Sequence, residues 1–490
     1  MSKPTPDIEG RGVASIVGNL SYLLGGRAVY FAVRFLYAVV LARLLGPQIY
    51  GMINYGIVWY LLFLPLTRMG VEVVLSRDAG RNRQEGNQTA ACTLTLQLAS
   101  IIAVTAVYLT LSWLIESDPT FRLMVFVFTF ALIGRSLTQW TESVYTAYEV
   151  NQYSFRQESF FRPLEVALGL LVIILWRDAL WVVVIHGLVW CTQAIYGFTI
   201  VHRRIFALRL DKNILELRRV FMQCFPLGIA LLLMAFPYQG PLIFFRHLSH
   251  HEELLGQFAL AMQVFFMLSH IPYALGNVSL PVLSRVQARN DGKDRIFVET
   301  VLRFSLLFGT CLALLGTALG PWLTLQIFGI RYTQAGFLIG PVLWLMIPWS
   351  VSHAFVRVLI ARRQDRQVMF SALIGAVLFS MITLGLVLRY QTIGAILSAG
   401  VGMVLTTLLL MFYLLSQMDM DLRSSLIKPG LTAISSVVVF YVLHTAGPMW
   451  SLLGAYVVMA FGCYLLSCMT PQDKLWLRNF SRFVARRCHL

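Results

Sequence analysis

The sequence is a succession of long apolar stretches joined by short polar segments, and this alternation limits the possible folds more than any other feature. A helix of about 20 apolar residues crosses the hydrocarbon core of a bilayer. The chain is 58% hydrophobic and only 13% charged, which is typical of a protein that crosses a membrane many times. We expect fourteen spans: 16–43, 52–74, 90–115, 121–146, 154–176, 179–202, 222–245, 255–281, 298–324, 335–360, 368–389, 391–416, 426–445 and 449–469.

Basic residues are distributed unevenly among the joining segments. If the N-terminus is cytoplasmic, 27 of the 39 Lys and Arg residues, Arg156 and Arg162 among them, fall in cytoplasmic segments and only 6 in external loops. This bias predicts that both termini are cytoplasmic, because positively charged loops stay inside. It also explains most of the net charge of +16 without a nucleic-acid partner. The other six lie within spans: Arg27, Arg34, Arg68, Arg135, Arg303 and Arg357.

The chain contains an internal repeat with an offset of 203 to 214 residues. The segment RLLGPQIYG from Arg43 resembles RHLSHHEELLG from Arg246, and AYEVNQYSFRQ from Ala147 resembles ARRQDRQVMF from Ala361. Both copies begin on the cytoplasmic side, so we expect two six-helix bundles related by a parallel pseudo-two-fold axis along the membrane normal. Transporters with this architecture bind their substrate between the halves.

The repeat also predicts how the chain divides. We expect an N-terminal six-helix lobe at 1–206, a cytoplasmic amphipathic linker at 207–221 and a C-terminal six-helix lobe at 222–420. Two extra spans at 421–470 fall outside the repeat, and a basic amphipathic tail follows at 471–490. The tail repeats a basic residue every fourth position between apolar ones, which predicts a helix that lies on anionic lipid headgroups.

Two arginines in the first span form the clearest candidate for a functional site. Arg27 and Arg34 are seven residues apart, two helical turns, so both side chains project from one face, about 10 Å apart along the axis. A charge inside a membrane is costly and usually faces a protein interior or a water-filled cavity. The pair therefore favours a cationic stripe that lines a cavity. The alternative is structural: Arg27 pairs with a carboxylate, and Arg34 extends to the nearer interface.

The sequence gives no indication of an enzyme or of a cofactor. Walker A, H-E-x-x-H and G-x-S-x-G motifs are absent from the sequence, and the seven cysteines show no C-x-x-C spacing, as expected for free thiols. The external loops are too short for the catalytic groups of a membrane glycosyltransferase. His247, His250 and His251 precede Glu252 and Glu253, but we interpret this group as a solvated loop and not as a metal site.

The turn LARLLGPQIYG after the first span resembles that of the polysaccharide transporter family, the Wzx-type flippases of the MATE/MOP flippase superfamily. The basic run Arg77–Arg83, the segment from Ala147 to Arg162 and the segment Leu280–Arg285 are similar to family patterns as well. The resemblance covers residues 10–415. It implies a MATE-like, all-α fold with two six-helix bundles around a central cavity that opens alternately to each side of the bacterial inner membrane.

The resemblance also implies a substrate: an undecaprenyl-pyrophosphate-linked oligosaccharide, which is the repeat unit of O-antigen, capsule or exopolysaccharide. A polysaccharide polymerase is then a possible partner, beside the membrane lipids. Arginine binds pyrophosphate with a planar fork of donors and stays charged. The candidates for substrate binding are Arg27, Arg34, Arg135, Arg246, Arg303 and Arg357.

Several alternatives remain open from the sequence. One is a cation-coupled multidrug exporter, which would need acidic residues in the first bundle, and another is a lipid II flippase. Arg303 could equally form a structural pair with Glu299, one turn earlier. The coupling ion could be H⁺ or Na⁺. The acidic residues near membrane depth could each carry a proton or pair with an arginine: Glu72, Glu142, Glu165 and Glu299.

Overall fold

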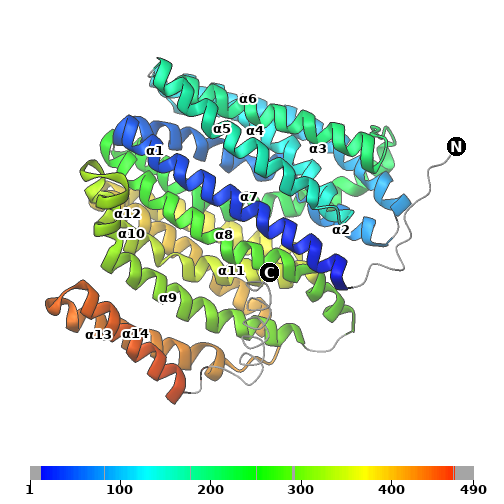
Figure 1. The fold of residues 1–490 in the computed structure, drawn as a ribbon. Coiled ribbons are helices and arrows are strands. Elements are labelled where there is room, and N and C mark those ends of the chain that lie inside the picture. The colour runs from blue at the N-terminus through cyan, green and yellow to red at the C-terminus, as the bar shows by residue number, and fades with distance from the viewer. Residues whose placement is uncertain are drawn as a thin grey trace. The chain divides into compact units, whose positions relative to one another are not determined.

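The computed structural model describes residues 13–81, 83–176, 178–249, 251–289, 293–362, 364–466 and 468. The amphipathic tail expected at 471–490 lies outside this part of the chain. Fourteen α-helices lie within it (Figure 1): α1 Val13–Arg68, α2 Val71–Arg81, α3 Arg83–Ile115, α4 Pro119–Ala147, α5 Gln152–Trp176, α6 Ala179–Ile200, α7 Ile214–Ser249, α8 Glu252–Arg289, α9 Lys293–Phe328, α10 Thr333–Leu343, α11 Met346–Ala361, α12 Asp365–Leu415, α13 Lys428–Val442 and α14 Pro448–Leu465.

Two of the helices are broken, and each provides two spans. Within α1, Gly46 has φ 77°, a left-handed conformation that favours glycine, and Pro47 cannot continue the hydrogen-bond ladder. Within α12, Gln391 has φ 51° and interrupts the helix in the same way. These breaks separate the expected spans 16–43 from 52–74, and 368–389 from 391–416.

The expected all-α polytopic fold is confirmed. Ten helices in the described residues are long and apolar enough to cross a membrane, and α10 with α11 forms an eleventh candidate, bent by 44°. When α1 and α12 are divided at their breaks, α8 is included and α10 with α11 counts as one span, each of the fourteen expected spans falls mainly on helical residues. The protein is therefore a multi-pass membrane protein.

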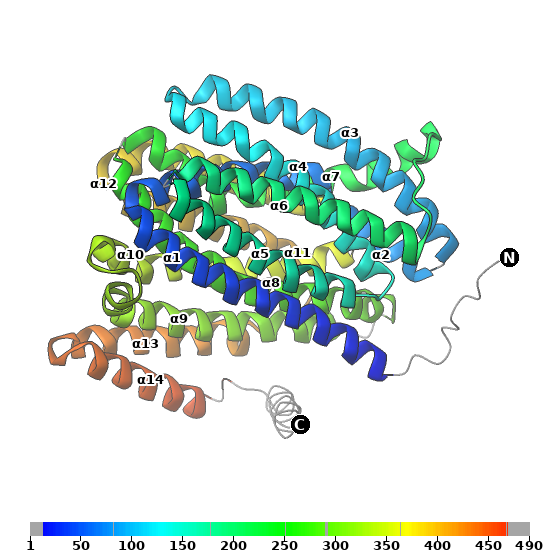
Figure 2. The ribbon, with the colours of Figure 1, turned by 45° about the horizontal axis from the view of Figure 1, so that its top comes forward.

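The chain forms two compact units, Met1–Ile243 and Phe244–Leu490. In the first unit, α4 packs along α6, and α1 contacts α4 and α5 (Figures 1 and 2). The buried core of this unit joins the end of α1 to α2, α3, α4 and the first turns of α7, and includes Leu75, Trp140, Tyr145 and Cys224.

In the second unit, α9 packs against α10, and α11 packs against α8 and α12. The helices α13 and α14, which lie outside the sequence repeat, pack together on α9 (Figures 1 and 2). Phe440 and Ala455 are buried there against Leu314, and the Tyr456 hydroxyl donates to the Cys311 carbonyl at 2.9 Å.

The segment between α6 and α7 has no regular secondary structure from Phe206 to Asn213, so only the second part of the expected linker is helical. It is tied to α3, because the Asp211 backbone N–H donates to Thr95 Oγ1 at 3.1 Å. The Cys92 thiol donates to Asp211 Oδ2 at 3.1 Å. Hydrogen bonds from the Asn213 backbone and from Cys92 hold the pKa of Asp211 below its usual range.

Candidate functional site

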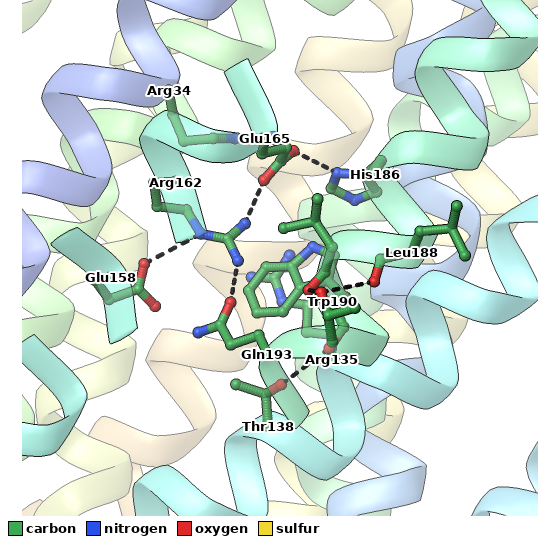
Figure 3. A network of polar contacts seen from close by, with 12 residues as sticks. Arg34, Arg135, Thr138, Glu158, Arg162, Glu165, His186, Leu188, Trp190 and Gln193 are labelled. Atoms are coloured by element: carbon green, nitrogen blue, oxygen red, sulfur yellow. Dashed lines mark hydrogen bonds and ion pairs between the residues drawn. The ribbon is translucent and has the colours of Figure 1, made fainter. Parts of the chain in front are cut away.

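Polar side chains from α1, α4, α5 and α6 meet inside the first unit, among helices that are otherwise apolar (Figure 3). On α5, Glu158, Arg162 and Glu165 occupy positions i, i+4 and i+7. On α6, His186 and Gln193 are also seven residues apart. Because a helix has 3.6 residues per turn, each set lies on one face. We call these residues, with Arg34, Tyr60, Arg135 and Trp190, the arginine network.

Arg162 is the most enclosed member of the arginine network, with an exposure of 0%. Its guanidinium donates to Glu165 Oε2 and to Gln193 Oε1, and its Nε lies 3.4 Å from Glu158 Oε2. The guanidinium carbon also lies 3.9 Å from the centroid of the Trp190 ring. Figure 3 shows Arg162 between these partners. Two carboxylates and an aromatic face compensate the charge of this buried cation, which is typical of a structural role.

Arg34 reaches the network from the first half of α1. Its Nη1 lies 2.7 Å from Glu165 Oε1, and its side chain is 14% exposed, against 1% for Glu165. Unlike Arg162, it therefore has one carboxylate partner and an accessible side. A pyrophosphate could compete with Glu165 for this guanidinium, because both groups offer paired oxygens to its donors.

His186 and Tyr60 connect Glu165 to a third arginine. His186 Nδ1 lies 2.6 Å from Glu165 Oε1, and His186 Nε2 lies 3.1 Å from the Tyr60 hydroxyl. The same hydroxyl accepts a hydrogen bond from Arg135 Nη1 at 3.0 Å. The two ends of the arginine network are thus joined by an uninterrupted chain of hydrogen bonds through buried groups.

Arg135 on α4 is the cation of the network that has no carboxylate in direct contact within the described part of the chain; Glu142, two turns further along α4, acts on it only at longer range. Its guanidinium carbon lies 5.0 Å from the centroid of the Trp190 ring and 5.9 Å from that of Tyr60. Its buried Nε makes no hydrogen bond within the described residues. Aromatic faces stabilise a cation only partly, so Arg135 retains donors and charge for an anion.

The network carries a net positive charge. Among its own members, three arginines face two glutamates, Glu158 and Glu165, which leaves a formal charge of +1 when His186 is neutral; Glu142, which acts on Arg135 from two turns away, is not counted in it. Charged groups at membrane depth mark substrate or ion pathways more often than they mark pure scaffolding. A positive excess at this depth is suited to an anionic group.

Two of the six arginines expected to bind substrate, Arg34 and Arg135, belong to this network. The side chain of Arg27 lies outside the described residues. The other three lie in the second unit. Arg246 Nη2 is 3.9 Å from Glu252 Oε1, Arg303 Nη2 donates to Thr300 Oγ1 at 3.1 Å, and Arg357 is buried in α11.

Glu299 has partners that the sequence did not predict. Glu299 lies one turn before Arg303, but its Oε1 accepts from Arg295 Nε at 2.8 Å and from the Asp421 backbone N–H at 2.9 Å. The carboxylate thus joins α9 to the segment before α13.

The sequence assigned Arg162 to a cytoplasmic segment as an exposed charge, whereas the structure buries its side chain completely within α5, one of the candidate spans. Sequence reasoning also missed Tyr60, Glu158, Trp190 and Gln193, and it gave His186 no role. The spacing would have indicated them: polar residues recur every three or four positions in two adjacent apolar spans, and these positions share a helix face.

Comparison with known proteins identifies the family of this chain. The sequence profile of the family described as "Polysaccharide biosynthesis protein" matches residues 16–287, more than half of the chain. No curated protein sequence matches the chain.

Similar folds occur among solved membrane transporters. The inward closed conformation of the lipid II flippase MurJ has a TM-score of 0.63 and 13% identity, covering 94% of this chain and 100% of MurJ. A MOP superfamily transporter from Pyrococcus furiosus has a TM-score of 0.61 and 12% identity, with 85% and 98% covered. A MATE transporter from Vibrio cholerae has a TM-score of 0.57 and 12% identity, with 82% and 97% covered.

The profile match and the shared fold agree with the buried cationic network among membrane-spanning helices. The chain belongs to the family described as "Polysaccharide biosynthesis protein" and shares its fold with these solved transporters.

Proposed function

We propose that this protein translocates an undecaprenyl-pyrophosphate-linked oligosaccharide across the bacterial inner membrane by alternating access, with both chain termini in the cytoplasm. The family and the fold support a flippase. One solved neighbour is itself named as a flippase of lipid II, a molecule of the same chemical class. The lipid tail stays in the bilayer while the pyrophosphate and the sugars cross through the protein.

The observation that carries the proposal is Arg135. A pyrophosphate that leaves water loses its hydration, and the cost is prohibitive unless fixed positive charge replaces it. Arg135 provides such a charge at membrane depth, held between two aromatic rings and not neutralised by an adjacent carboxylate. Arg34, whose one carboxylate partner among the described residues is Glu165, provides the second guanidinium of the same site.

A cation-coupled drug exporter fits this site less well. It would require a carboxylate available to a cationic drug, whereas Glu158 and Glu165 both lie against Arg162. Lipid II and an oligosaccharide carrier share the lipid pyrophosphate, so only the attached glycan distinguishes them. Competition between the two substrates in one transport assay would show which glycan is preferred.

The experiment is translocation in reconstituted proteoliposomes, with a fluorescent short-chain polyprenyl-pyrophosphoryl oligosaccharide as substrate. A hydrogen bond to a charged group contributes about 1.5–3 kcal/mol, so Arg135→Ala should weaken substrate binding by about 10- to 150-fold. Arg135→Lys should restore it only in part, because lysine keeps the charge but loses the planar fork.

Arg122→Ala is the matched control. Arg122 lies on the same helix, and its guanidinium also contacts an aromatic ring, 5.8 Å from the Trp113 centroid, but it is near the helix start and bonded to the Glu116 carbonyl. We expect normal translocation from this variant. Normal translocation by a well-incorporated Arg135→Ala protein would instead remove Arg135 from the substrate site and the main support for the proposal.

A further inference from the structure

The hydrogen bonds of the arginine network have a defined direction. Arg135 Nη1 can only donate, so it donates to the Tyr60 oxygen. The Tyr60 hydroxyl hydrogen is then directed at His186 Nε2, which must accept it. His186 Nδ1 therefore carries the hydrogen and donates to the Glu165 carboxylate. These partners assign one tautomer: a neutral imidazole protonated on Nδ1.

In this arrangement, His186 Nε2 is the ring nitrogen that can still take up a proton. If Nε2 of His186 is protonated, it donates to the Tyr60 oxygen, which already accepts from Arg135. The Tyr60 hydroxyl hydrogen then turns to a new acceptor. That acceptor can be an oxygen of an anion at Arg135, because the Tyr60 oxygen lies 3.0 Å from Arg135 Nη1. The change moves a single hydroxyl hydrogen and forms or breaks no covalent bond other than that to the added proton.

Because of the charge of the site, uptake of that proton by His186 is favourable only when an anion is bound. The empty network has a formal charge of +1, and a pyrophosphate that links a lipid to a sugar is a dianion, so the occupied site would hold an unbalanced negative charge. An unbalanced buried charge is strongly disfavoured. One proton on His186 brings the occupied site to neutrality.

The other ionisable groups around His186 are less suited to take up this proton. From α5, Glu158 and Glu165 are held by Arg162, and Glu165 also by Arg34 of α1. From α4, Arg135 is already charged, and Glu142 lies two turns further along that helix, outside the hydrogen-bond chain. Tyr37 and Tyr60 of α1 are phenols, which are neutral near pH 7. His186 itself is buried, 5% exposed, between a carboxylate and a phenol.

We propose that His186 takes up one proton when the anionic headgroup binds at Arg34 and Arg135. The inference rests on the proposed function, because it assumes that this site binds the pyrophosphate. By linkage, proton uptake and headgroup binding then strengthen each other. Headgroup affinity should fall by up to about tenfold per pH unit as the pH rises through the range in which the proton is taken up.

The test measures protons taken up per molecule bound. Purified full-length protein in detergent is mixed, in weakly buffered solution with a pH indicator, with a short-chain polyprenyl-pyrophosphoryl-N-acetylglucosamine. This diester does not titrate near neutral pH, so any proton exchange belongs to the protein. The wild-type protein should take up about one proton per bound molecule. His186→Gln should bind the probe more weakly, without proton uptake and without the pH dependence.

His353→Gln is the control, because His353 is another histidine of a membrane-spanning helix, half-buried and bonded through Nδ1 to the Trp349 carbonyl at 3.0 Å. It should behave as the wild type.

Binding by the wild type without proton uptake and with an affinity independent of pH would overturn the inference, as would full proton uptake by His186→Gln. The wild-type measurements decide the matter even if His186→Gln fails to fold. Absence of binding to the wild type would overturn the proposed function, and this inference with it.

Discussion

Arg162 and Arg34 contact the same carboxylate, yet their surroundings assign them different roles. Arg162 has an exposure of 0% and contacts two carboxylates, an amide and an indole ring. Arg34 has one carboxylate partner and a partly accessible side chain. We infer that Arg162 holds α5 and α6 together, and that Arg34 can exchange its partner for a substrate.

We predict that Arg162→Met destabilises the protein more than Arg34→Met does. Removing one member of a buried ion pair costs about 3–5 kcal/mol, because the remaining charge stays buried without compensation. Thermal unfolding in detergent should show a clearly lower midpoint for Arg162→Met, and Glu158→Gln in the same chain should recover part of the loss. An Arg162→Met protein with wild-type stability and no headgroup binding would show that Arg162 is a ligand.

Close contact between α4 and α6 sets the position of Trp190, whose ring lies against both Arg135 and Arg162. A side chain at Gly134 would meet the backbone of Trp190 and Cys191. Two hydrogen bonds reinforce the contact. Thr138 Oγ1 lies 3.4 Å from the Trp190 carbonyl oxygen, and the Cys191 thiol lies 3.3 Å from the Phe130 carbonyl oxygen. The two helix backbones can approach this closely because Gly134 has no Cβ.

We predict that Gly134→Ala separates the two helices and displaces Trp190. Backbone atoms cannot yield as a flexible side chain can, so overpacking should cost about 1–3 kcal/mol. Thermal unfolding and headgroup binding should both be impaired. Gly385→Ala in α12 is the control, because a Cβ there has no neighbour within 4 Å among the described residues. Equal behaviour of the two variants would contradict this role for Gly134.

The sequence predicted the helices better than it predicted the network. Span positions follow from local hydrophobicity, and the Gly46–Pro47 break was visible because both residues disrupt a helix wherever they occur. The partners of Arg162 come from two helices that are distant in sequence, and counting basic residues by segment cannot detect compensation across helices. Arg34 and Arg135 were identified as buried cations, but their connection through Tyr60 and His186 required tertiary structure.

At the level of the whole chain, the repeat agrees with where the helices end. After Arg43 the helix breaks at Gly46, and after Arg246 the chain leaves α7 at Ser249 and enters α8 at Glu252. Likewise α4 ends at Ala147 and α11 at Ala361, the two repeated alanines. The parallel relation of the halves remains a prediction: spans one to six should superpose on spans seven to twelve by a rotation about an axis near the membrane normal.

We predict the side of the membrane on which each connecting segment lies. In a background with the seven native cysteines replaced, a membrane-impermeant maleimide should label Ser117→Cys and His251→Cys in intact cells. Lys212→Cys and Ser416→Cys should react only after permeabilisation. All four positions are exposed, so failure to label is informative. Labelling of 212 and 251 from the same side would refute the span count, because α7 alone separates them.

The positive excess of the arginine network has an electrical consequence. Three guanidinium groups against two carboxylates make the empty site a carrier of one positive charge, whereas the site loaded with a dianionic headgroup and one proton is neutral. If the headgroup and the proton on His186 cross together, each export cycle should move one net negative charge outward, and transport should be electrogenic. With both termini cytoplasmic, as we propose, an inside-negative membrane potential drives the cycle forward by about 2.3 kcal/mol per 100 mV.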